Sequence, residues 1–451
     1  MSVSAREQYL LELINEARLD PLANAKRYIT SFSKLTSPDA DVQNALRGFD
    51  VDGALLKKRL GNLDSVAPVA WNAKLSAAAL GHNDQMIAQD AQEHEGIGDG
   101  DPATRMSAHG YVFSTLGENI FAYASNPLHT HAAFMVDWGG PNGGMQDPPG
   151  HRDNIMAADF REVGLGITGE DSRRTQVGPE IVTQDFGTRQ NSPAVFVLGV
   201  AYNDTDKDHF YSMGEGVKNL KVTLGGTSTF SATAGGYTLE SSDTGRQTIA
   251  FSGGGLSGRV DAEVSLKEGM NVKFDVINGD TLHTSVSAKV SGPLSTIDGL
   301  GTQGLKLTAG SGRQTVFGTD GKDTLDGGSG KDRLHGGLGD DKLIGGSSSD
   351  TFAFDAKLGK SNVDAVTDFS VKQGDSFALE HDIFTKIGKG ELGGGAYHEG
   401  SRAHDKSDRI IYDEAKGKLF YDADGKGAKD AVQFATLDKH LTLDHHDFLI
   451  V

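Results

Sequence analysis

The sequence predicts a multidomain α+β protein, in which a mainly helical N-terminal part is followed by a small β-sandwich and a parallel β-roll. Three observations predict this fold. Apolar residues recur at helical spacing from residue 5 to about residue 160, they alternate with polar residues after Asp204, and a nine-residue unit repeats from Gly318 onward. The length of 451 residues agrees with two to four domains at roughly 100–200 residues each.

Composition narrows the functional classes. The chain has 43 Lys and Arg against 62 Asp and Glu, a net charge of −19. This charge argues against nucleic acid or an anionic membrane as the main partner and favours hard cations. No apolar run is long enough to predict a transmembrane helix. With no cysteine, disulfides, thiolate metal sites and cysteine nucleophiles are excluded.

The N-terminal part predicts helices and then short strands. Ser4 and Glu7 have the spacing of a capping box that begins a helix, and no basic stretch leads into an apolar one, so no cleaved signal peptide is expected. A second helix is predicted from Ala73 to about Gln92. From Val163 the stretches VGLGI, IVTQDFG and AVFVLGVAY predict strands.

A β-sandwich is predicted over residues 217–291. Apolar residues alternate with polar ones in three runs of this segment, and glycine-rich turns separate the runs. The first run is Leu220, Val222 and Leu224.

The internal repeat consists of four nonapeptides: GTDGKDTLD, GGSGKDRLH, GGLGDDKLI and GGSSSDTFA. Each carries one aspartate, followed two positions later by a large apolar residue. The preceding unit, AGSGRQTVF, keeps the register but has Gln314 in the aspartate position, which predicts a degenerate capping turn.

This repeat predicts calcium sites in a β-roll. Glycines permit tight turns that expose backbone carbonyls, and the carboxylates complete the oxygen ligands that Ca²⁺ prefers. A flexible linker is the alternative, but the strict register argues against it. The predicted ligand residues are Asp323, Asp332, Asp341 and Asp350 with Gly327, Gly328, Gly330, Gly336, Gly337 and Gly339.

A second calcium site is predicted in the loop of residues 203–216, which begins with NDTDKDHFYSMGE. This segment has the spacing of an EF-hand loop, except that His209 replaces the glycine at position 6. That departure should strain the turn and weaken binding; a solvated acidic linker is the alternative. The predicted ligands are Asp204, Asp206, Asp208, the carbonyl of Phe210, and Glu215. A third calcium site is considered at Asp422 and Asp424, where no third carboxylate is evident.

The nonapeptides resemble the calcium-binding repeats of RTX proteins, hemolysin-type exoproteins of Gram-negative bacteria. The resemblance covers a roll over 292–353 and continues over 354–451, which ends in DFLIV. It implies export by a type I secretion ABC transporter, an extracellular location and folding by external calcium. A last buried strand is the alternative interpretation of the terminus. The sandwich weakly resembles transthyretin-like modules.

Residues 5–202 resemble the CAP superfamily of cysteine-rich secretory, antigen 5 and plant pathogenesis-related proteins. The resemblance is carried by ELINEARLDP, PVAWNAKLSAAALGHNDQM, RMSAHGY, GENI, DW, PPGHRDNIM, FREVGLGI and VTQDFG, in the family's order. It implies an α-β-α sandwich with a cleft lined by two histidines and up to two glutamates.

Three positions match the cleft of that family: His94, Glu118 and His151. Pro141 stands where the second glutamate would fall, so the cleft has three members at most. His94 and His151 are candidate zinc ligands, since two imidazoles and a carboxylate suit Zn²⁺. His82 is expected to be a packed helix residue.

Three functions follow. The first is a secreted calcium-binding protein whose cleft holds a divalent metal and a lipid, sterol or peptide. The second is a metal-dependent hydrolase acting through His94, Glu118 and His151; the absence of HExxH and GxSxG motifs excludes the usual RTX proteases and lipases. The third is a surface or matrix component in which the β modules bind.

Overall fold

The computed structural model describes residues 3–171 and 175–451. The chain divides into two compact units, one of residues 1–244 with 266–274 and one of residues 245–265 with 275–451. The first contains all eight α-helices of the described residues and the second is β-rich, which confirms the predicted fold class. The segment 217–291 is shared between the units, and the finer domain boundaries stay predictions.

The first unit is built on a four-stranded sheet with the strand order β1-β4-β5-β2. Strand β1 runs parallel to β4, and β5 is antiparallel to both β4 and β2. The bounds are β1 Ala70–Trp71, β2 Phe113–Ala124, β4 Glu162–Gly169 and β5 Glu180–Arg189.

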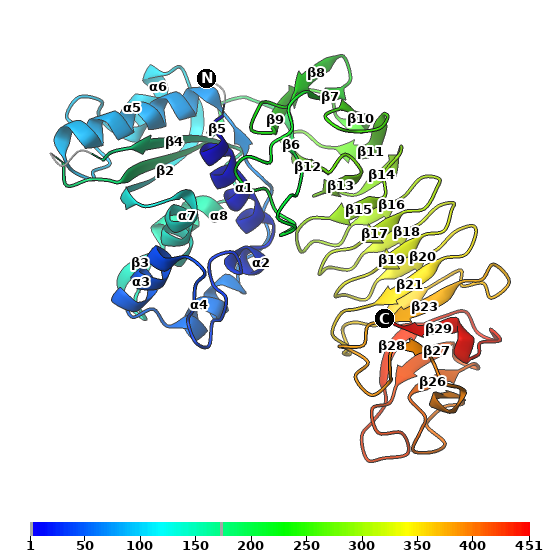
Figure 1. Ribbon diagram of the computed structural model, residues 1–451. Coiled ribbons are helices and arrows are strands. Elements are labelled where there is room, and N and C mark those ends of the chain that lie inside the picture. The colour runs from blue at the N-terminus through cyan, green and yellow to red at the C-terminus, as the bar shows by residue number, and fades with distance from the viewer. Residues whose placement is uncertain (1–2, 172–174) are drawn as a thin grey trace. The chain divides into compact units, whose positions relative to one another are not determined.

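Helices cover both faces of this sheet. Helices α5 and α6 lie on one face and α1, α7 and α8 on the other, with α2, α3 and α4 beyond them (Figure 1). The unit is therefore an α-β-α sandwich. The bounds are α1 Ala5–Leu19, α2 Pro21–Ala25, α3 Ala40–Gly48, α4 Gly53–Leu60, α5 Ala73–Gln89, α6 Pro102–Ala108, α7 Pro127–Val136 and α8 Gly150–Met156.

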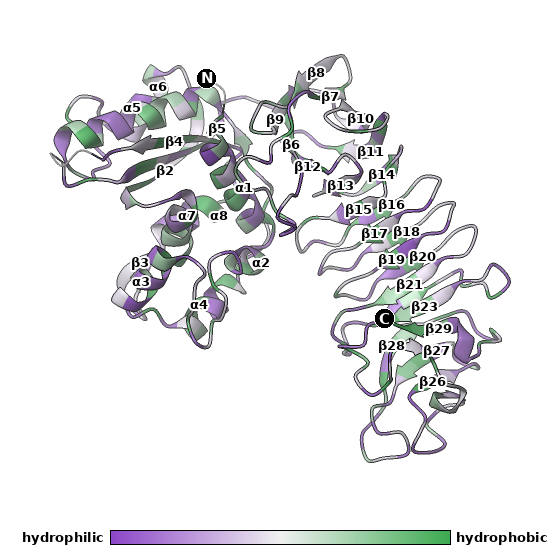
Figure 2. Cartoon of the chain, in the orientation of Figure 1, coloured by the Kyte–Doolittle hydropathy of each residue, from purple (hydrophilic) through white to green (hydrophobic). Residues whose placement is uncertain are grey.

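Helix α5 lies directly on strand β4 because the strand has glycines there. A Cβ on Gly164 would come within 2.1 Å of the α5 backbone, and one on Gly166 within 2.8 Å. The helix ends at Gln89, three residues before the predicted end, since Asp90 adopts a left-handed conformation (φ +53°). Figure 2 shows hydrophobic and hydrophilic residues alternating along α5, as expected of a helix with one buried face.

Polar residues stabilise the start of the N-terminal helix α1 and attach the helix to the rest of the unit. The predicted capping box of Ser4 and Glu7 is confirmed. The fully buried Arg18 guanidinium donates to the carbonyls of Ala67, Ile155, Ala157 and Phe160, and so joins α1 to the loop before β1 and to the end of α8 with the loop after it. Burial lowers the pKa of Arg18 to about 9, which still leaves it charged at neutral pH.

Shorter strands complete the first unit. Strand β6 pairs with β9 and strand β7 with β8, both antiparallel. Their bounds are β3 Trp138–Asn142, β6 Val195–Tyr202, β7 Leu220–Leu224, β8 Thr227–Phe230 and β9 Gly236–Ser241.

The second unit contains the predicted β-roll. Each strand pairs in parallel with the strand two further along the chain, 18 residues later in the repeats, so two nonapeptides make one coil. Figure 1 shows β15 to β21 as successive rungs. The roll strands are β13 Thr281–Thr284, β14 Ala288–Ser291, β15 Thr296–Gly299, β16 Lys306–Thr308, β17 Thr315–Phe317, β18 Thr324–Asp326, β19 Arg333–His335, β20 Lys342–Ile344, β21 Thr351–Phe354, β22 Asp364–Val366 and β23 Ser376–Leu379.

In the three-residue strands β16 to β20, the roll core is a column of single apolar residues, one from each strand. They are fully buried because each three-residue strand directs its middle side chain inward. Beyond the repeats the column continues with Phe377 and Phe448, whose rings lie 5.0 Å apart. The remaining strands of the unit are β10 Gly245–Gly253, β11 Val260–Leu266, β24 Gly390–Glu391, β25 Tyr397–Glu399, β26 Ile410–Asp413, β27 Lys418–Tyr421, β28 Val432–Thr436 and β29 Phe448–Ile450, and β12 Asn271–Ile277 is shared with the first unit.

Candidate calcium sites and histidine cleft

The four repeat aspartates form two buried rows along the turns of the roll. Each is no more than 2% exposed. One carboxylate oxygen, Oδ1, accepts the backbone N–H of the residue one coil earlier: Asp332 from Gln314 (2.7 Å), Asp341 from Asp323 (2.7 Å) and Asp350 from Asp332 (2.8 Å). The rows therefore hold successive coils in register through side chains as well as strands.

The second carboxylate oxygen distinguishes the aspartates. Oδ2 of Asp332, Asp341 and Asp350 is buried without any hydrogen-bond partner in the described part of the chain. A Cβ on Gly327 would lie 2.8 Å from Oδ2 of Asp332 and 2.7 Å from the carbonyl oxygen of Gly345, so carboxylate and carbonyl oxygens meet there. Buried oxygens without a donor fit a Ca²⁺ ion.

The start of the roll has a different arrangement. Both Oδ atoms of Asp323 accept hydrogen bonds, and Oδ2 takes the backbone N–H of Thr319 at 2.6 Å. In the preceding turn, the Gln314 amide nitrogen lies 3.3–3.4 Å from the carbonyls of Ser311 and Leu294. Protein donors thus reach both carboxylate oxygens of Asp323, which the sequence predicts as a calcium ligand. The Gln314 side chain donates to backbone carbonyls in the turn that the sequence predicts as a degenerate cap.

The predicted EF-hand-like loop brings three carboxylates together. Oxygens of Asp204, Asp206 and Asp208 lie within 4.8 Å of one another. Over residues 3–171 and 175–451, no other three His, Asp or Glu side chains lie close enough together to share one ion. Glu215 instead accepts from Thr205 and Ser212 within the loop. The three aspartates fit calcium, while Glu215 stabilises the loop.

The two histidines of the predicted cleft, His94 and His151, each pair with a buried carboxylate. His94 Nδ1 lies 2.8 Å from Oε1 of Glu118, whose other oxygen contacts Arg105. Burial raises the pKa of Glu118, but the hydrogen bonds from His94 and Arg105 outweigh it and lower that pKa overall. Glu118 is therefore an anion that orients the His94 ring and leaves Nε2 as the ring's ligand atom.

The second cleft histidine has a partner that the sequence did not predict. His151 Nδ1 lies 2.8 Å from Oδ1 of the fully buried Asp137, and the His151 backbone N–H donates to Oδ2 at 3.0 Å. Pro141 lies in β3 beyond this pair. His151 is thus oriented by Asp137 and His94 by Glu118. His82 is fully buried, with ring nitrogens 2.9 Å from Asp99 and from the Glu93 carbonyl, as a packed helix residue.

Comparisons with known proteins agree with both halves of this description. A model of the cysteine-rich secretory protein (CAP) family matches residues 11–186, and a model of the RTX calcium-binding nonapeptide repeat matches four copies over residues 308–353. The chain therefore carries a CAP domain and a set of RTX calcium-binding repeats. The match confirms the predicted resemblances, and the two matched segments lie in different units.

Among solved structures, an extracellular SCP-domain protein from Bacillus anthracis is similar at 21% identity and a TM-score of 0.22. The match covers 34% of this chain and 44% of the Bacillus chain, so this chain spans under half of that relative's length. An outer surface protein from Borrelia burgdorferi matches at 15% identity and a TM-score of 0.22, over 34% of this chain and 97% of its own. The search among curated proteins gives no match. Across the described residues, no helix has the length and apolar character needed to span a bilayer.

The CAP domain also buries an acid that the sequence did not single out. Asp185 on β5 is fully buried and lies opposite Glu118 in the sheet register. Burial, and then the charge of Glu118, raise the pKa of Asp185 well above its usual range. The word VTQDFG contains this residue, but only the paired strands reveal its neighbour.

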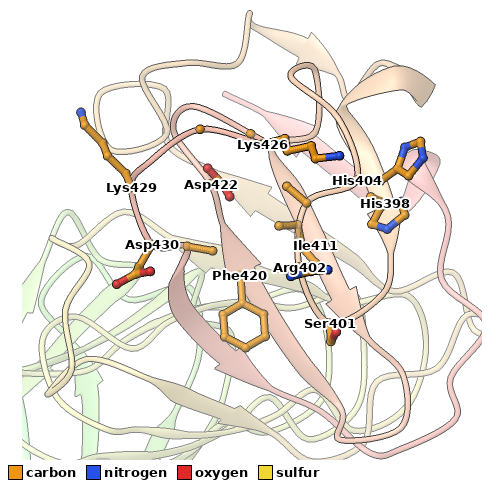
Figure 3. Close-up of a pocket in the computed structure, with 14 residues that line it drawn as sticks. His398, Ser401, Arg402, His404, Ile411, Phe420, Asp422, Lys426, Lys429 and Asp430 are labelled. Atoms are coloured by element: carbon orange, nitrogen blue, oxygen red, sulfur yellow. The ribbon is translucent and has the colours of Figure 1, made fainter.

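The polar site around Asp422 and Asp424 has a mixed charge. Asp424 donates its backbone N–H to Asp422 at 3.1 Å, and its own Oδ2 accepts N–H groups of the following turn. Asp422 faces a pocket of about 760 Å³ that Arg402, Lys426 and Lys429 also line (Figure 3). These cations do not favour a metal ion, so calcium there stays a prediction.

Calcium binding by the RTX roll is expected to weaken at acid pH. Burial raises the pKa of Asp341 to about 7 and that of Asp350 to about 6. Because these values are raised, the calcium-free folded roll binds more protons than the unfolded chain, and its stability falls as pH rises from about 4 to about 7. Calcium must displace the same protons, so its affinity rises over that interval.

Calcium titration at pH 5.5 and at pH 8 tests this dependence. We expect the calcium concentration that half-saturates the roll to be at least about tenfold higher at pH 5.5 than at pH 8. The EF-hand-like loop serves as an internal comparison, because hydrogen bonds lower the pKa of the exposed Asp206 carboxyl. Calcium binding by this loop should therefore change less between the two pH values. Equal midpoints at the two pH values would contradict the expectation.

Replacing His209 by glycine is expected to stabilise the EF-hand-like loop. His209 has φ +59°, a left-handed conformation that costs a residue with a Cβ about 1 kcal/mol. We expect His209→Gly to raise the free energy of unfolding of the first unit by up to ~1 kcal/mol in saturating calcium. Denaturation followed by the fluorescence of Trp71 and Trp138 measures it, since both tryptophans of the chain lie in that unit. His209→Ala keeps the Cβ and should show no gain; an equal gain there would refute the strain explanation.

Proposed function

We propose that this protein is secreted through a type I ABC transporter and that extracellular calcium completes its C-terminal fold. The observation that carries the proposal is the set of three buried aspartate oxygens, on Asp332, Asp341 and Asp350, that no donor in the described chain reaches. Without a cation, these carboxylates stand buried and unneutralised, which disfavours a closed roll. Calcium is scarce in the cytoplasm and abundant outside, so the roll would stay open for export and close after it.

The RTX repeats also support the location. Proteins with such repeats and CAP domains are typically extracellular, and the absence of cysteine is compatible with export in an unfolded form from a Gram-negative bacterium. The CAP domain would then be the part that acts outside the cell. The lipid, sterol or peptide ligand, the hydrolase alternative and the adhesion alternative stay predictions from the resemblance.

Counting bound calcium in variants of the full chain tests the roll. Asp332→Ala, Asp341→Ala and Asp350→Ala should each lose one ion by native mass spectrometry, because each removes an oxygen that has no other partner. Asp323→Ala is the matched control, since Thr319 already satisfies its Oδ2. The proposal fails if the first three variants bind as many calcium ions as the wild type.

For the cleft, we propose a divalent metal such as zinc held by His94 and His151. What supports it is that a carboxylate fixes Nδ1 of each ring, an arrangement common behind metal-bound histidines. Native mass spectrometry of the wild type and of the His94→Ala/His151→Ala double variant tests it. A zinc adduct confined to the wild type is the expected result, and identical spectra with calcium alone would rule the cleft metal out.

A further inference from the structure

Asp364 lies outside the nonapeptide repeats but occupies the next position of an aspartate row. Its Oδ1 accepts the backbone N–H of Asp341 at 3.2 Å, as Asp341 accepts that of Asp323. Strand β22, which begins at Asp364, continues the parallel ladder after β20. The residue is 4% exposed. The roll therefore extends one coil beyond the segment that the repeat pattern covers, and Asp364 is its next buried carboxylate.

The second oxygen of Asp364 faces that of Asp341. A Cβ on Gly336 would lie 2.4 Å from Oδ2 of Asp341 and 3.2 Å from Oδ2 of Asp364. In the neighbouring site the equivalent point, at Gly327, is flanked by Oδ2 of Asp332 and the carbonyl of Gly345. At the end of the repeats, a second carboxylate oxygen thus replaces the glycine carbonyl.

Two buried carboxylates that face each other require a counter-charge. Oδ2 of Asp341 has no hydrogen-bond partner among the described residues, although Asp341 is only 1% exposed. Burial and then the charge of Asp341 raise the pKa of Asp364 to about 8, so proton uptake is the alternative to a cation. Ca²⁺, ligated by oxygens at roughly 2.3–2.6 Å, would bridge the two carboxylates.

We propose that Asp341 and Asp364 together hold a calcium ion that joins the last repeats to the C-terminal segment. The proposal rests on the calcium-bound roll proposed above. It assigns a ligand, Asp364, that lies outside the matched repeats, which cover residues 308–353. It makes the order of the segment that follows residue 353 depend directly on calcium. This site carries two carboxylates where its neighbour at Asp332 carries one with a carbonyl, so it should be the tighter of the two.

The next aspartate in the other row provides a matched control. Asp375 follows Asp350 as Asp364 follows Asp341, and its Oδ1 accepts the Asp350 N–H at 2.9 Å. Its Oδ2, however, accepts the N–H of Ser370 at 2.8 Å. Asp375 is therefore satisfied by the protein itself, and it should not be needed for a bound ion.

The experiment compares full-length wild type, Asp364→Asn, Asp375→Asn and Asp341→Asn by native mass spectrometry and by thermal unfolding, both in calcium. We expect Asp364→Asn to bind one calcium ion fewer and to unfold at a lower temperature than the wild type. Asp375→Asn should keep the full calcium count.

Two results would overturn the assignment, and they are distinguishable. If Asp364→Asn keeps the full calcium count while Asp341→Asn loses an ion, then Asp364 is only a structural residue and the proposed calcium roll stands. If neither Asp341→Asn nor Asp364→Asn changes the count, the calcium role of this row fails together with the inference.

Discussion

Removing calcium with EGTA is expected to unfold the roll while the CAP domain stays folded. Asp332, Asp341 and Asp350 each bury a carboxylate oxygen that has no donor in the described chain. An uncompensated buried charge costs several kcal/mol, and a whole domain is stable by only about 5–15 kcal/mol. Loss of the three ions should therefore exceed the stability of the roll.

Hydrogen exchange of the full-length protein measures this separately for each unit. In EGTA we expect rapid exchange in peptides from β15 to β23, with helices α1 and α5 as protected as in calcium. Calcium should restore protection and magnesium at the same concentration should not, because Mg²⁺ requires a tighter octahedral site. Unchanged protection of the roll strands in EGTA would show that the buried aspartates need no cation.

Lys273→Met is expected to destabilise the first unit by about 3–5 kcal/mol, the largest single-residue effect that we predict. Lys273 Nζ lies 2.8 Å from Oε2 of Glu12, and both side chains are 4% exposed. Gln8 donates to the other Glu12 oxygen at 2.7 Å. Without the ammonium group, the Glu12 carboxylate on helix α1 would lose its buried counter-charge.

The double variant Glu12→Gln/Lys273→Met is the control, because it removes both charges and should recover most of the lost stability. Urea denaturation followed by tryptophan fluorescence reports both variants, since Trp71 and Trp138 lie in this unit. A loss below about 1 kcal/mol in the single variant would show that the pair behaves like an exposed one.

The repeats were predictable from sequence because each coil uses the same word at a fixed spacing. A fixed period of nine determines the strands, the buried apolar column and the aspartate rows together. Asp364 escaped that analysis because the last coils are longer: it stands 23 positions after Asp341, where the repeats have 18. The signal was nevertheless present, since Asp364 and Asp375 are followed two positions later by Val366 and Phe377, as in the repeats.

The pairing of His94 with Glu118 could be anticipated only from the family resemblance. His94, Glu118 and His151 lie far apart in sequence, and no local pattern shows that His94 pairs with Glu118 and His151 with Asp137. Asp137 could have been noticed in the word DW, but its role depends on a left-handed turn after α7 (φ +57°) that places it beside His151. Long-range pairing of this kind depends on how helices pack on the sheet, which periodicity does not encode.

The most direct measurement is a crystal structure of the calcium-loaded protein, with anomalous scattering used to locate the ions. We predict an ion about 2.3–2.6 Å from Oδ2 of each of Asp332, Asp341 and Asp350. We predict none at Asp323, where Thr319 already donates to the carboxylate. Water molecules or protein donors at those three oxygens in place of ions would contradict the proposal that calcium closes the roll.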